Sequence, residues 1–353
     1  MMKPGRKLLA LLAAALLLAG VSGCAQLAYL SQSAGGHLRL LASAQPVERL
    51  LQDPQTSAEL GERLRLAQRL REFSVQQLQL PDNASYRRYA DLRREAVVWN
   101  VVAAPELSLR LKTWCFPLMG CVGYRGYFDP AEAQAYARAL QAEEPGLEVL
   151  VYPVPAYSTL GWSNWLGGDP LLSSFIRYPE GELAGLIFHE LAHQLVYVAD
   201  DTAFNEAFAT AVERRGAQAW LAQRADAPAR EAYEGRQRGR ERFRALAGRY
   251  RAQLEALYRG PLSEAEKRSA KAELMRALRA EPGLGAWAAQ ANNASLALLA
   301  AYNELSPAFE ALLDAQGGDW PRFYAEVQRL AALPKSQRQQ QLLLPTKNHQ
   351  PGD

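Results

Sequence analysis

The stretch HELAH at residues 189–193 constrains this chain more than any other feature. It sets His189 and His193 four positions apart, a spacing that puts both side chains on one face of an α-helix. The surrounding segment EGELAGLIFHELAHQLVYVA has no internal proline and repeats apolar residues at helical spacing. The sequence therefore predicts a helix over 180–198 that directs both imidazoles toward one Zn²⁺ ion.

A catalytic zinc site needs a third protein ligand and one open position. The other two histidines, His37 and His349, lie far from the motif in the sequence, so we expect an acid as the third ligand. The nearby acidic residues are Asp200, Asp201, Glu206 and Glu213. The first two lie in a predicted turn, where they can cap the next helix or hydrogen-bond to a histidine ring.

Helix geometry ranks the remaining two acids. Residues 202–222 predict a second helix, and so short a connection makes consecutive helices roughly antiparallel. With the turn centred near 199–200, His193 lies level with Glu206. Glu213 lies seven residues further, about 10 Å along the helix axis. The geometry therefore favours Glu206 as the third zinc ligand.

These residues predict hydrolysis of a peptide bond by a zinc-activated water. Glu190 is the candidate general base, which takes a proton from the water and passes it to the leaving amine. The tetrahedral oxyanion also needs a donor, and Tyr157 and Tyr302 are candidates, although a packing role fits each of them as well. A strand predicted over 147–161 offers an edge to an extended peptide.

The first 23 residues carry the whole charge excess of the chain, which has 40 basic and 37 acidic side chains. Their basic residues are Lys3, Arg6 and Lys7. A basic start, a short apolar run and small residues before Cys24 resemble a bacterial lipoprotein signal. The pattern predicts a lipid on Cys24, and Ala25 after it favours the outer membrane, facing the periplasm. The remaining chain is formally neutral, so its charge gives no reason to expect nucleic acid as a partner.

Export bears on the other two cysteines. An exported chain matures in an oxidising compartment, so Cys115 and Cys121 are expected to form a disulfide. A metal site is the weaker interpretation, because no histidine or further cysteine lies nearby in the sequence.

Periodicity predicts an α+β fold that is predominantly helical, with a small mixed sheet. Residues 24–55 are interpreted as a tether, broken at Gly35-Gly36, followed by a first helix. Strands are predicted over 97–107, 124–128 and 147–161. Helices are predicted over 56–80, 84–95, 129–146, 180–198, 202–222, 226–258, 262–281, 284–316 and 319–333. Residues 334–353 are polar and predict a frayed tail.

Several stretches resemble the bacterial putative aminopeptidase family of exported lipoproteins. They are HELAHQ (189–194), DDTAFNEAFATAVE (200–213), WCFPLMGCVGYRGYF (114–128) and AYSTLGW (156–162). The resemblance implies a zincin-like core of the gluzincin kind over 56–333, with an active-site helix pair that carries HExxH and the downstream glutamate. It implies His189, His193 and Glu206 as zinc ligands and Glu190 as catalytic base. The gap from His193 to Glu206 is shorter than in the large gluzincin aminopeptidases.

The same residues are compatible with two other functions. One is an envelope endoprotease, since nothing in the sequence identifies the acids that would hold a free α-amine. The other is a non-catalytic lipoprotein with a structural zinc site. A purely structural zinc closes its fourth position with another ligand, so three ligands together with Glu190 favour an enzyme that is bound to the membrane by its N-terminal lipid and acts on peptides.

Overall fold

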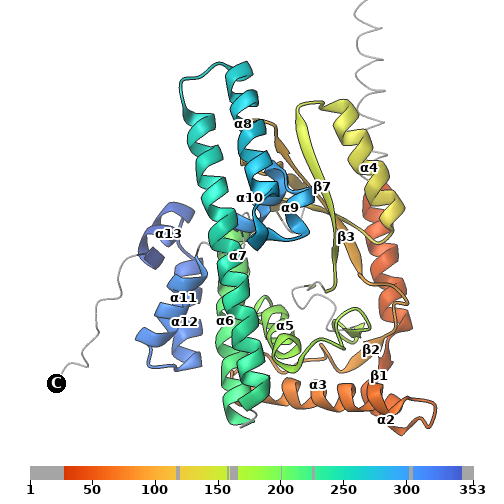
Figure 1. Ribbon diagram of the computed structural model, residues 1–353. Coiled ribbons are helices and arrows are strands. Elements are labelled where there is room, and N and C mark those ends of the chain that lie inside the picture. Colours follow the sequence, from red (N-terminus) through yellow and green to blue (C-terminus); the bar gives the residue numbers. More distant parts are fainter. Residues whose placement is uncertain are drawn as a thin grey trace, which may run out of the picture.

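The computed structural model describes residues 28–116, 120–156, 159, 166–199, 201–224, 227–301 and 305–343 (Figure 1). The predicted signal over residues 1–23 and the predicted lipidation site Cys24 lie outside these ranges. Among the described residues, no helix is both long enough and apolar enough to cross a membrane.

Helices make up most of the described chain, as predicted. The first helix covers residues 28–43. The others are α2 (Val47–Gln52), α3 (Ala58–Gln76), α4 (Pro130–Glu143), α5 (Glu180–Ala192), α6 (Thr202–Gln223), α7 (Ala227–Arg259), α8 (Glu264–Arg279), η2 (Pro282–Leu284), α9 (Trp287–Gln290), α10 (Asn293–Ala301), α11 (Ser306–Ala315), α12 (Trp320–Ala331) and α13 (Lys335–Leu343).

The strands are short and form small sheets. They are β1 (Gln45–Pro46), β2 (Arg88–Ala90), β3 (Val98–Pro105), β4 (Trp114–Phe116), β5 (Gly120–Val122), β6 (Arg125–Tyr127), β7 (Leu147–Val154) and β8 (Leu171–Leu172). The orders are β6-β3-β7, β1-β2-β8 and β4-β5. Because β2 pairs antiparallel with β1 and parallel with β8, the small mixed sheet of the prediction is present.

The β3–β7 pair is the longest, with a register that runs from Val98 opposite Val154 to Pro105 opposite Leu147. Successive side chains of β3 alternate between two apolar clusters. Val101 packs with residues of α4, and Val102 packs with Ala294 of α10. These two helices therefore cover opposite faces of the sheet (Figure 1). β7 lies at the edge of its sheet, a position that tolerates Pro153.

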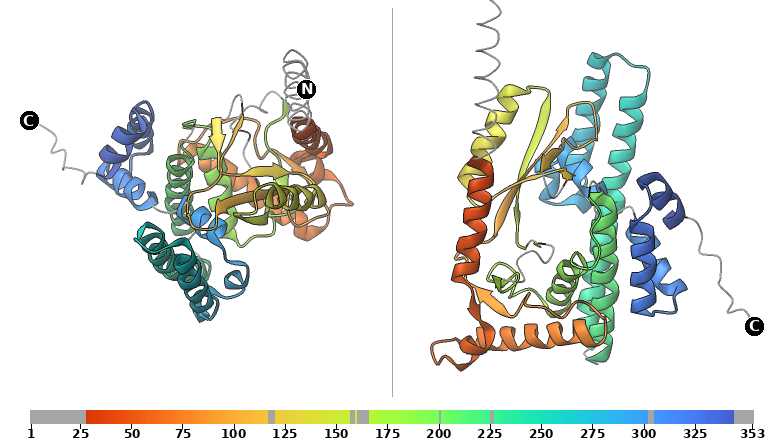
Figure 2. Two further views of the ribbon diagram at one scale, coloured as in Figure 1. Left: turned by 90° about the horizontal axis from the view of Figure 1, so that it is seen from above. Right: turned by 180° about the vertical axis from the view of Figure 1, so that it is seen from behind.

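Helices α5 and α6 lie side by side (Figures 1 and 2), and their buried residues belong to the largest apolar cluster of the described residues. Leu183, Ile187 and Leu191 form a fully buried stripe on α5, because residues three to four apart face the same side of a helix. On α6, Phe204 packs edge-on against Phe309 of α11, with ring centroids 5.1 Å apart. The elements that carry the HELAH motif and Glu206 are thus packed on several sides.

The predicted helix over 84–95 is wrong. This stretch contains β2 and irregular backbone, with Tyr86 at φ 64°. Residues 88–90 pair with β1 and β8 instead of forming helical hydrogen bonds, and a buried side chain from another element holds the backbone before them. The guanidinium of Arg71, on α3, donates to the carbonyl oxygens of Ser85 (3.1 Å) and Pro81 (2.6 Å). These backbone acceptors therefore serve a tertiary contact, and sequence periodicity carries no signal of it.

The structure differs from the sequence prediction in two further places. The Gly35-Gly36 pair does not interrupt the first helix, because the helix over 28–43 runs through both residues. A Cβ on Gly36 would lie 2.3 Å from the ring of Phe128, so this glycine permits close packing. The predicted helix over 284–316 is divided into α9, α10 and α11. At the start of α10, the amide of Asn293 donates to three carbonyl oxygens at the end of β3 and in the loop after it.

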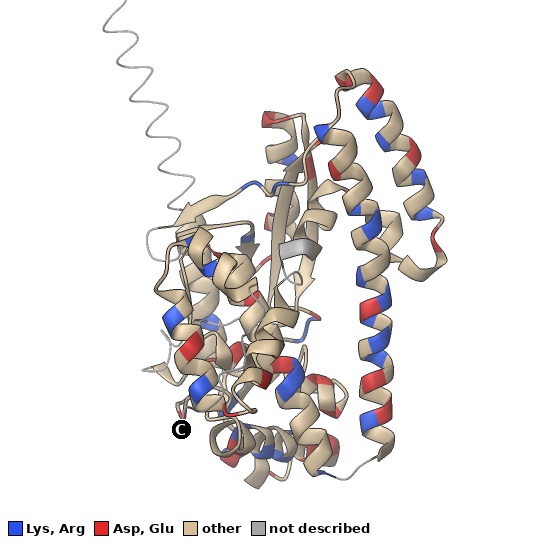
Figure 3. Cartoon of the chain, turned by 90° about the vertical axis from the view of Figure 1, so that its left-hand side faces the viewer, with Lys and Arg blue, Asp and Glu red and all other residues tan. Residues whose placement is uncertain are grey.

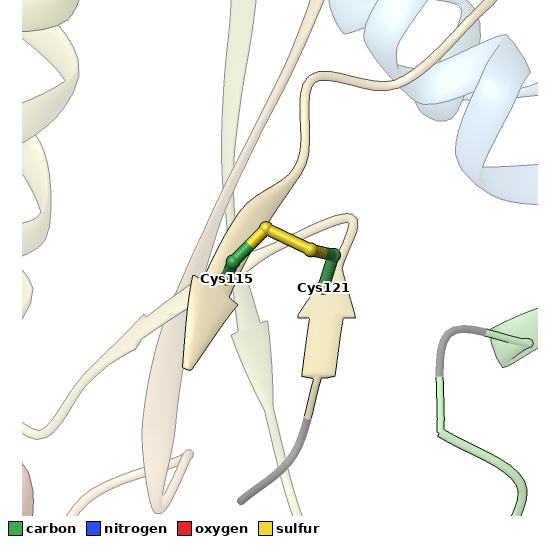
Figure 4. Close-up of a disulfide and its surroundings, with 2 residues drawn as sticks. All are labelled: Cys115 and Cys121. Carbon is green, nitrogen blue, oxygen red and sulfur yellow. A yellow bond between two sulfur atoms is a disulfide. The ribbon is translucent and has the colours of Figure 1, made fainter. Parts of the chain in front are cut away.

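The predicted disulfide is present. Cys115 on β4 and Cys121 on β5 are paired residues of one hairpin and are covalently linked (Figure 4). Their Cα atoms are 3.9 Å apart. The residues between the two strands, 117–119, are not among those described.

Charges of both signs interleave along α7, as Figure 3 shows. Exposed neighbours form pairs such as Arg259 with Glu255, whose side chains approach to 2.6 Å. Nine arginines and four glutamates (9 − 4 = +5) leave α7 basic, and none of these charged side chains is fully buried.

Candidate metal centre

Helix α5 ends at Ala192, six residues earlier than predicted, and His193 is its C-cap with φ −58° and ψ −22°. The backbone N–H of His193 still donates to the carbonyl of His189 (3.3 Å), so both histidines stay on one turn. The chain leaves the helix because Asn205 of α6 holds Val198: its side chain accepts from the Val198 N–H and donates to the Val198 carbonyl, both at 2.8 Å. That contact replaces the helical bonds the backbone would otherwise make.

Asp201 begins α6. Its carboxylate accepts from the N–H of Phe204 (3.4 Å), and its carbonyl accepts from the N–H of Asn205 (3.1 Å). The predicted N-cap is therefore present, and it fixes the first turn of the helix. Glu206 follows in the next turn, with its side chain directed back toward α5.

Three side chains converge between the two helices. The Nε2 atoms of His189 and His193 are 3.2 Å apart. The Oε2 atom of Glu206 lies 3.4 Å from the first of these nitrogens and 3.7 Å from the second. Among the described residues, this is the cluster of histidine, cysteine and acidic side chains whose ligand atoms could hold one metal ion. The structure thus brings together the three residues that the sequence singled out as ligands.

The donor set has the spacing and chemistry of a zinc site. Zinc bonds to histidine nitrogen and carboxylate oxygen at about 2.0–2.2 Å, and ligands in tetrahedral positions then lie about 3.3–3.5 Å apart. The observed separations of 3.2, 3.4 and 3.7 Å bracket that value. A shift of a few tenths of an ångström would complete the geometry. Two imidazoles and one carboxylate also leave a fourth position open, which a catalytic zinc requires.

Glu213 contacts the second ring nitrogen of His189, the one that does not face Glu206. Its Oε2 lies 3.1 Å from Nδ1 of His189, while Nε2 faces Glu206. The side chain reaches across α5 at Gly185, where a Cβ would lie 2.9 Å from Glu213 Cγ. A carboxylate on the distal nitrogen fixes the tautomer and orientation of a metal-binding histidine.

The sequence predicts Glu213 only as a distant candidate ligand. It assigns the hydrogen bond to a histidine ring to Asp200 or Asp201. Asp200 is not among the described residues, and Asp201 caps α6. The signal that could have identified Glu213 is its position seven residues after Glu206, which puts both carboxylates on one face of α6.

Electrostatic interactions couple the imidazole of His189 to the carboxylates of Glu206 and Glu213. Burial alone would raise the pKa of Glu206, but the neighbouring imidazoles lower it to about 2. Burial opposes charge on His189, yet its contacts with Glu206 and Glu213 raise its pKa well above the ordinary value. The pKa of Glu213 is lowered, because its contacts with His189 and nearby arginines outweigh the effect of burial. In the metal-free protein Glu206 and Glu213 are therefore ionised, and they favour a proton on the His189 imidazole between them.

Glu190 differs from the other two glutamates. Burial raises its pKa above the ordinary value, opposed by the two histidines and reinforced by the negative charge of Glu206. A carboxylate with a raised pKa is a stronger proton acceptor when ionised, which suits a general base working near neutral pH. Glu190 is half-buried and directly follows His189 on α5.

The two tyrosines that the sequence offered as oxyanion donors, Tyr157 and Tyr302, lie outside the described residues. The structure adds a third tyrosine, Tyr124, whose hydroxyl interacts with the charge of Glu206. It packs in the apolar cluster between β3 and α10. Burial raises the pKa of its hydroxyl, and the nearby charge of Glu206 adds to the effect, so the hydroxyl stays protonated and able to donate. Its sequence signal was weak, since it is one of 15 tyrosines.

Comparison with known proteins gives one match. A family model described as a putative aminopeptidase matches residues 28–342. That range contains α5, α6 and the three converging side chains. No curated protein and no solved structure matches the chain.

Proposed function

Because the chain belongs to the putative aminopeptidase family, we propose that it is a zinc-dependent peptidase whose reaction takes place between α5 and α6. The family gives the peptidase class, and the zinc dependence and the role of each residue are our proposal. One observation carries it. Two imidazole nitrogens and one carboxylate oxygen converge at 3.2–3.7 Å, with a half-buried glutamate next to the first histidine in the sequence.

His189, His193 and Glu206 would hold the metal. Bound there, zinc would polarise the substrate carbonyl and lower the pKa of water toward neutrality. Glu190 takes a proton from the attacking water as the carbon–oxygen bond forms. It then delivers that proton to the amine nitrogen as the carbon–nitrogen bond breaks, so the carboxylate is regenerated.

Two further side chains support the reaction in this proposal. Glu213 holds Nδ1 of His189, which keeps Nε2 directed toward Glu206. The protonated hydroxyl of Tyr124 can donate to the oxyanion that develops on the substrate carbonyl. It takes the role that sequence reasoning offered to Tyr157 and Tyr302.

The mechanism is tested with Glu190→Gln in full-length protein. The amide cannot accept the proton, so hydrolysis of a peptide library should fall by about 10²–10⁴-fold, whereas zinc content should stay near that of wild type. Glu234→Gln, on the exposed part of α7, is the matched control. Retained hydrolysis in Glu190→Gln would exclude this glutamate as the base. Bound zinc without hydrolysis in the wild type would identify a structural zinc lipoprotein.

We further propose that the enzyme removes N-terminal residues. Peptides with a free N-terminus and the same peptides carrying an acetyl group distinguish exopeptidase from endopeptidase action. An aminopeptidase should cleave only the free form at its first bond. Equal cleavage of both forms at internal bonds would instead assign an envelope endoprotease.

We propose that a lipid on Cys24 anchors the enzyme in the outer membrane, facing the periplasm. The disulfide between Cys115 and Cys121 supports export, because such bonds persist in oxidising compartments. Cys24→Ser should release the protein from the membrane fraction, and the mass of the N-terminal peptide of the wild type should show the lipid. A wild-type protein that fractionates as soluble would contradict the anchor.

A further inference from the structure

The C-terminal helix reaches the start of the helix that carries Glu206. Helix α13 packs against α11 and α12, on the side of α6 remote from the sheet (Figure 1). Nη1 of Arg338 lies 3.4 Å from Oδ2 of Asp201. Nζ of Lys335 lies 3.4 Å from Oδ1 of the same carboxylate. The segment predicted as a frayed tail thus supplies two cations to the N-cap of α6.

The Arg338–Asp201 pair is almost fully removed from water. The side chains are 5% and 1% exposed, whereas Lys335 is 55% exposed. Bringing two charges into the interior is costly, and loss of one partner leaves the other buried without its counter-charge. The placement of Asp201 therefore depends on Arg338 far more than on Lys335.

Arg338 makes two further contacts. Its Nη2 donates to the carbonyl of Leu333 (3.1 Å). Its guanidinium lies 5.0 Å from the ring centroid of Phe204, a fully buried residue two positions before Glu206. The arginine thus contacts both the cap of α6 and an apolar anchor of its first turn.

The contact between Arg338 and the start of α6 affects the metal centre because metal binding tolerates only small shifts of the ligand atoms. Ligand atoms must lie within about 0.2 Å of their ideal distances. Glu206 projects from the second turn of α6, whose first turn is fixed by the cap at Asp201. A small shift or fraying of that first turn would move Oε2 of Glu206 away from the imidazoles.

We propose that α13 is a clamp on α6, and that Arg338 is a positioning residue that keeps Glu206 in its place beside His189 and His193. The inference rests on the proposed zinc site. Arg338 touches neither the metal ligands nor a substrate. It acts through Asp201 and Phe204, which it fixes from the opposite side of the helix.

The experiment compares Arg338→Gln and Arg338→Lys with wild type in the full-length chain. Arg322→Gln, on α12, is the matched control because its side chain is 75% exposed. The zinc dissociation constant is measured by competition with a chelator. Hydrogen exchange of the amides at 202–206 is measured in the metal-free protein, so that it does not depend on zinc.

We expect Arg338→Gln to raise the zinc dissociation constant about 10-fold, the scale seen when an outer partner of a metal ligand is lost. Exchange at 202–206 should become faster, Arg338→Lys should recover most of both effects, and Arg322→Gln should change neither. Unchanged exchange at 202–206 in Arg338→Gln would overturn the clamp. Faster exchange with an unchanged zinc dissociation constant would overturn its role in placing Glu206.

A second variant covers the case in which Arg338→Gln does not fold. Asp201→Asn keeps an N-cap side chain and removes only its charge. It should raise the zinc dissociation constant to a similar extent. Combining it with Arg338→Gln or Arg338→Met should add little, because each substitution removes the same contact between Arg338 and Asp201. Independent, additive effects would contradict the proposal. If wild type binds no zinc, the proposed function fails, and the exchange data alone show whether α13 holds α6.

Discussion

The two helix pairs α5–α6 and α7–α8 place charge in opposite surroundings. In α5–α6, His189, His193 and Glu206 lie between apolar stripes, and the histidine–glutamate contacts are largely shielded from water. In α7–α8, charges lie mainly outside the apolar cluster, and a pair such as Arg259–Glu255 has exposed fractions of 78% and 34%. The first pair of helices gathers charge at one buried centre, whereas the second carries most of its charge at the surface, with Lys271 of α8 as a buried exception.

The difference shows where charge can do chemistry. A low-dielectric interior strengthens each charge interaction, so the pKa of Glu190 is raised and the pKa of Glu206 is lowered on neighbouring helices. Water and ions screen the ion pairs on α7. These pairs therefore contribute little to the free energy of unfolding. The variants below are expected to have large effects on α5–α6 and small ones on α7–α8.

The largest effect is expected for Glu206→Gln. A neutral amide is a poor zinc ligand, and loss of a direct ligand should exceed the about 100-fold that outer partners can cost. The zinc dissociation constant, measured by chelator competition, should rise by more than about 100-fold. Glu255→Gln on α7 should leave it unchanged. Equal constants for Glu206→Gln and wild type would remove Glu206 from the ligand set.

Two helical glycines provide the next comparison. In Gly185→Ala the new Cβ would meet Glu213 at 2.9 Å, so the free energy of unfolding should fall by about 2 kcal/mol. In Gly239→Ala on α7 no atom lies within 4 Å, so helix propensity should raise it by about 0.5–1 kcal/mol. Urea denaturation measures both. Changes of the same sign would show that the two helices are packed alike.

A smaller effect is expected for Glu213→Gln. The amide oxygen can still accept from Nδ1 of His189, but the negative charge that supports the imidazole is lost. The zinc dissociation constant should rise about 10-fold, or about 1.4 kcal/mol. Glu234→Gln on α7 is the control. A constant equal to that of wild type would make Glu213 a packing residue only.

The smallest effect is expected for Arg259→Gln, which removes an exposed pair on α7. Its cost in the free energy of unfolding should be below about 0.5 kcal/mol and should vanish at 1 M salt, because water and ions already screen the pair. Thermal and urea unfolding at low and high salt measure it. A salt-independent loss above 1 kcal/mol would mean that this pair is not a simple surface contact.

Local sequence was sufficient for some elements of the fold and site. The helix predicted over 129–146 is present as α4, with Asp129 at the N-cap and Pro130 in the first turn. HELAH predicted a helix face with both histidines, and the spacing from the turn favoured Glu206, which lies beside them. These features depend on periodicity and capping, which act within a few residues.

Other features depend on contacts between distant segments. Asn205 shortens α5 by bonding Val198, and pairing with β1 and β8 holds residues 88–90 in a strand where a helix was predicted. Glu213 reaches His189 only because α5 and α6 approach closely at Gly185. None of these side chains differs, in the sequence, from an ordinary polar residue on a helix.

The sequence by itself determined the chemistry that could be present: two histidines on one helix face, a glutamate beside them and acids on the next helix. The tertiary structure decided which acid faces each imidazole nitrogen, and that the polar C-terminal segment folds against the cap of α6. The physical reason is range. Helical periodicity and capping act over a few residues, whereas a buried ion contact is placed by the packing of whole elements.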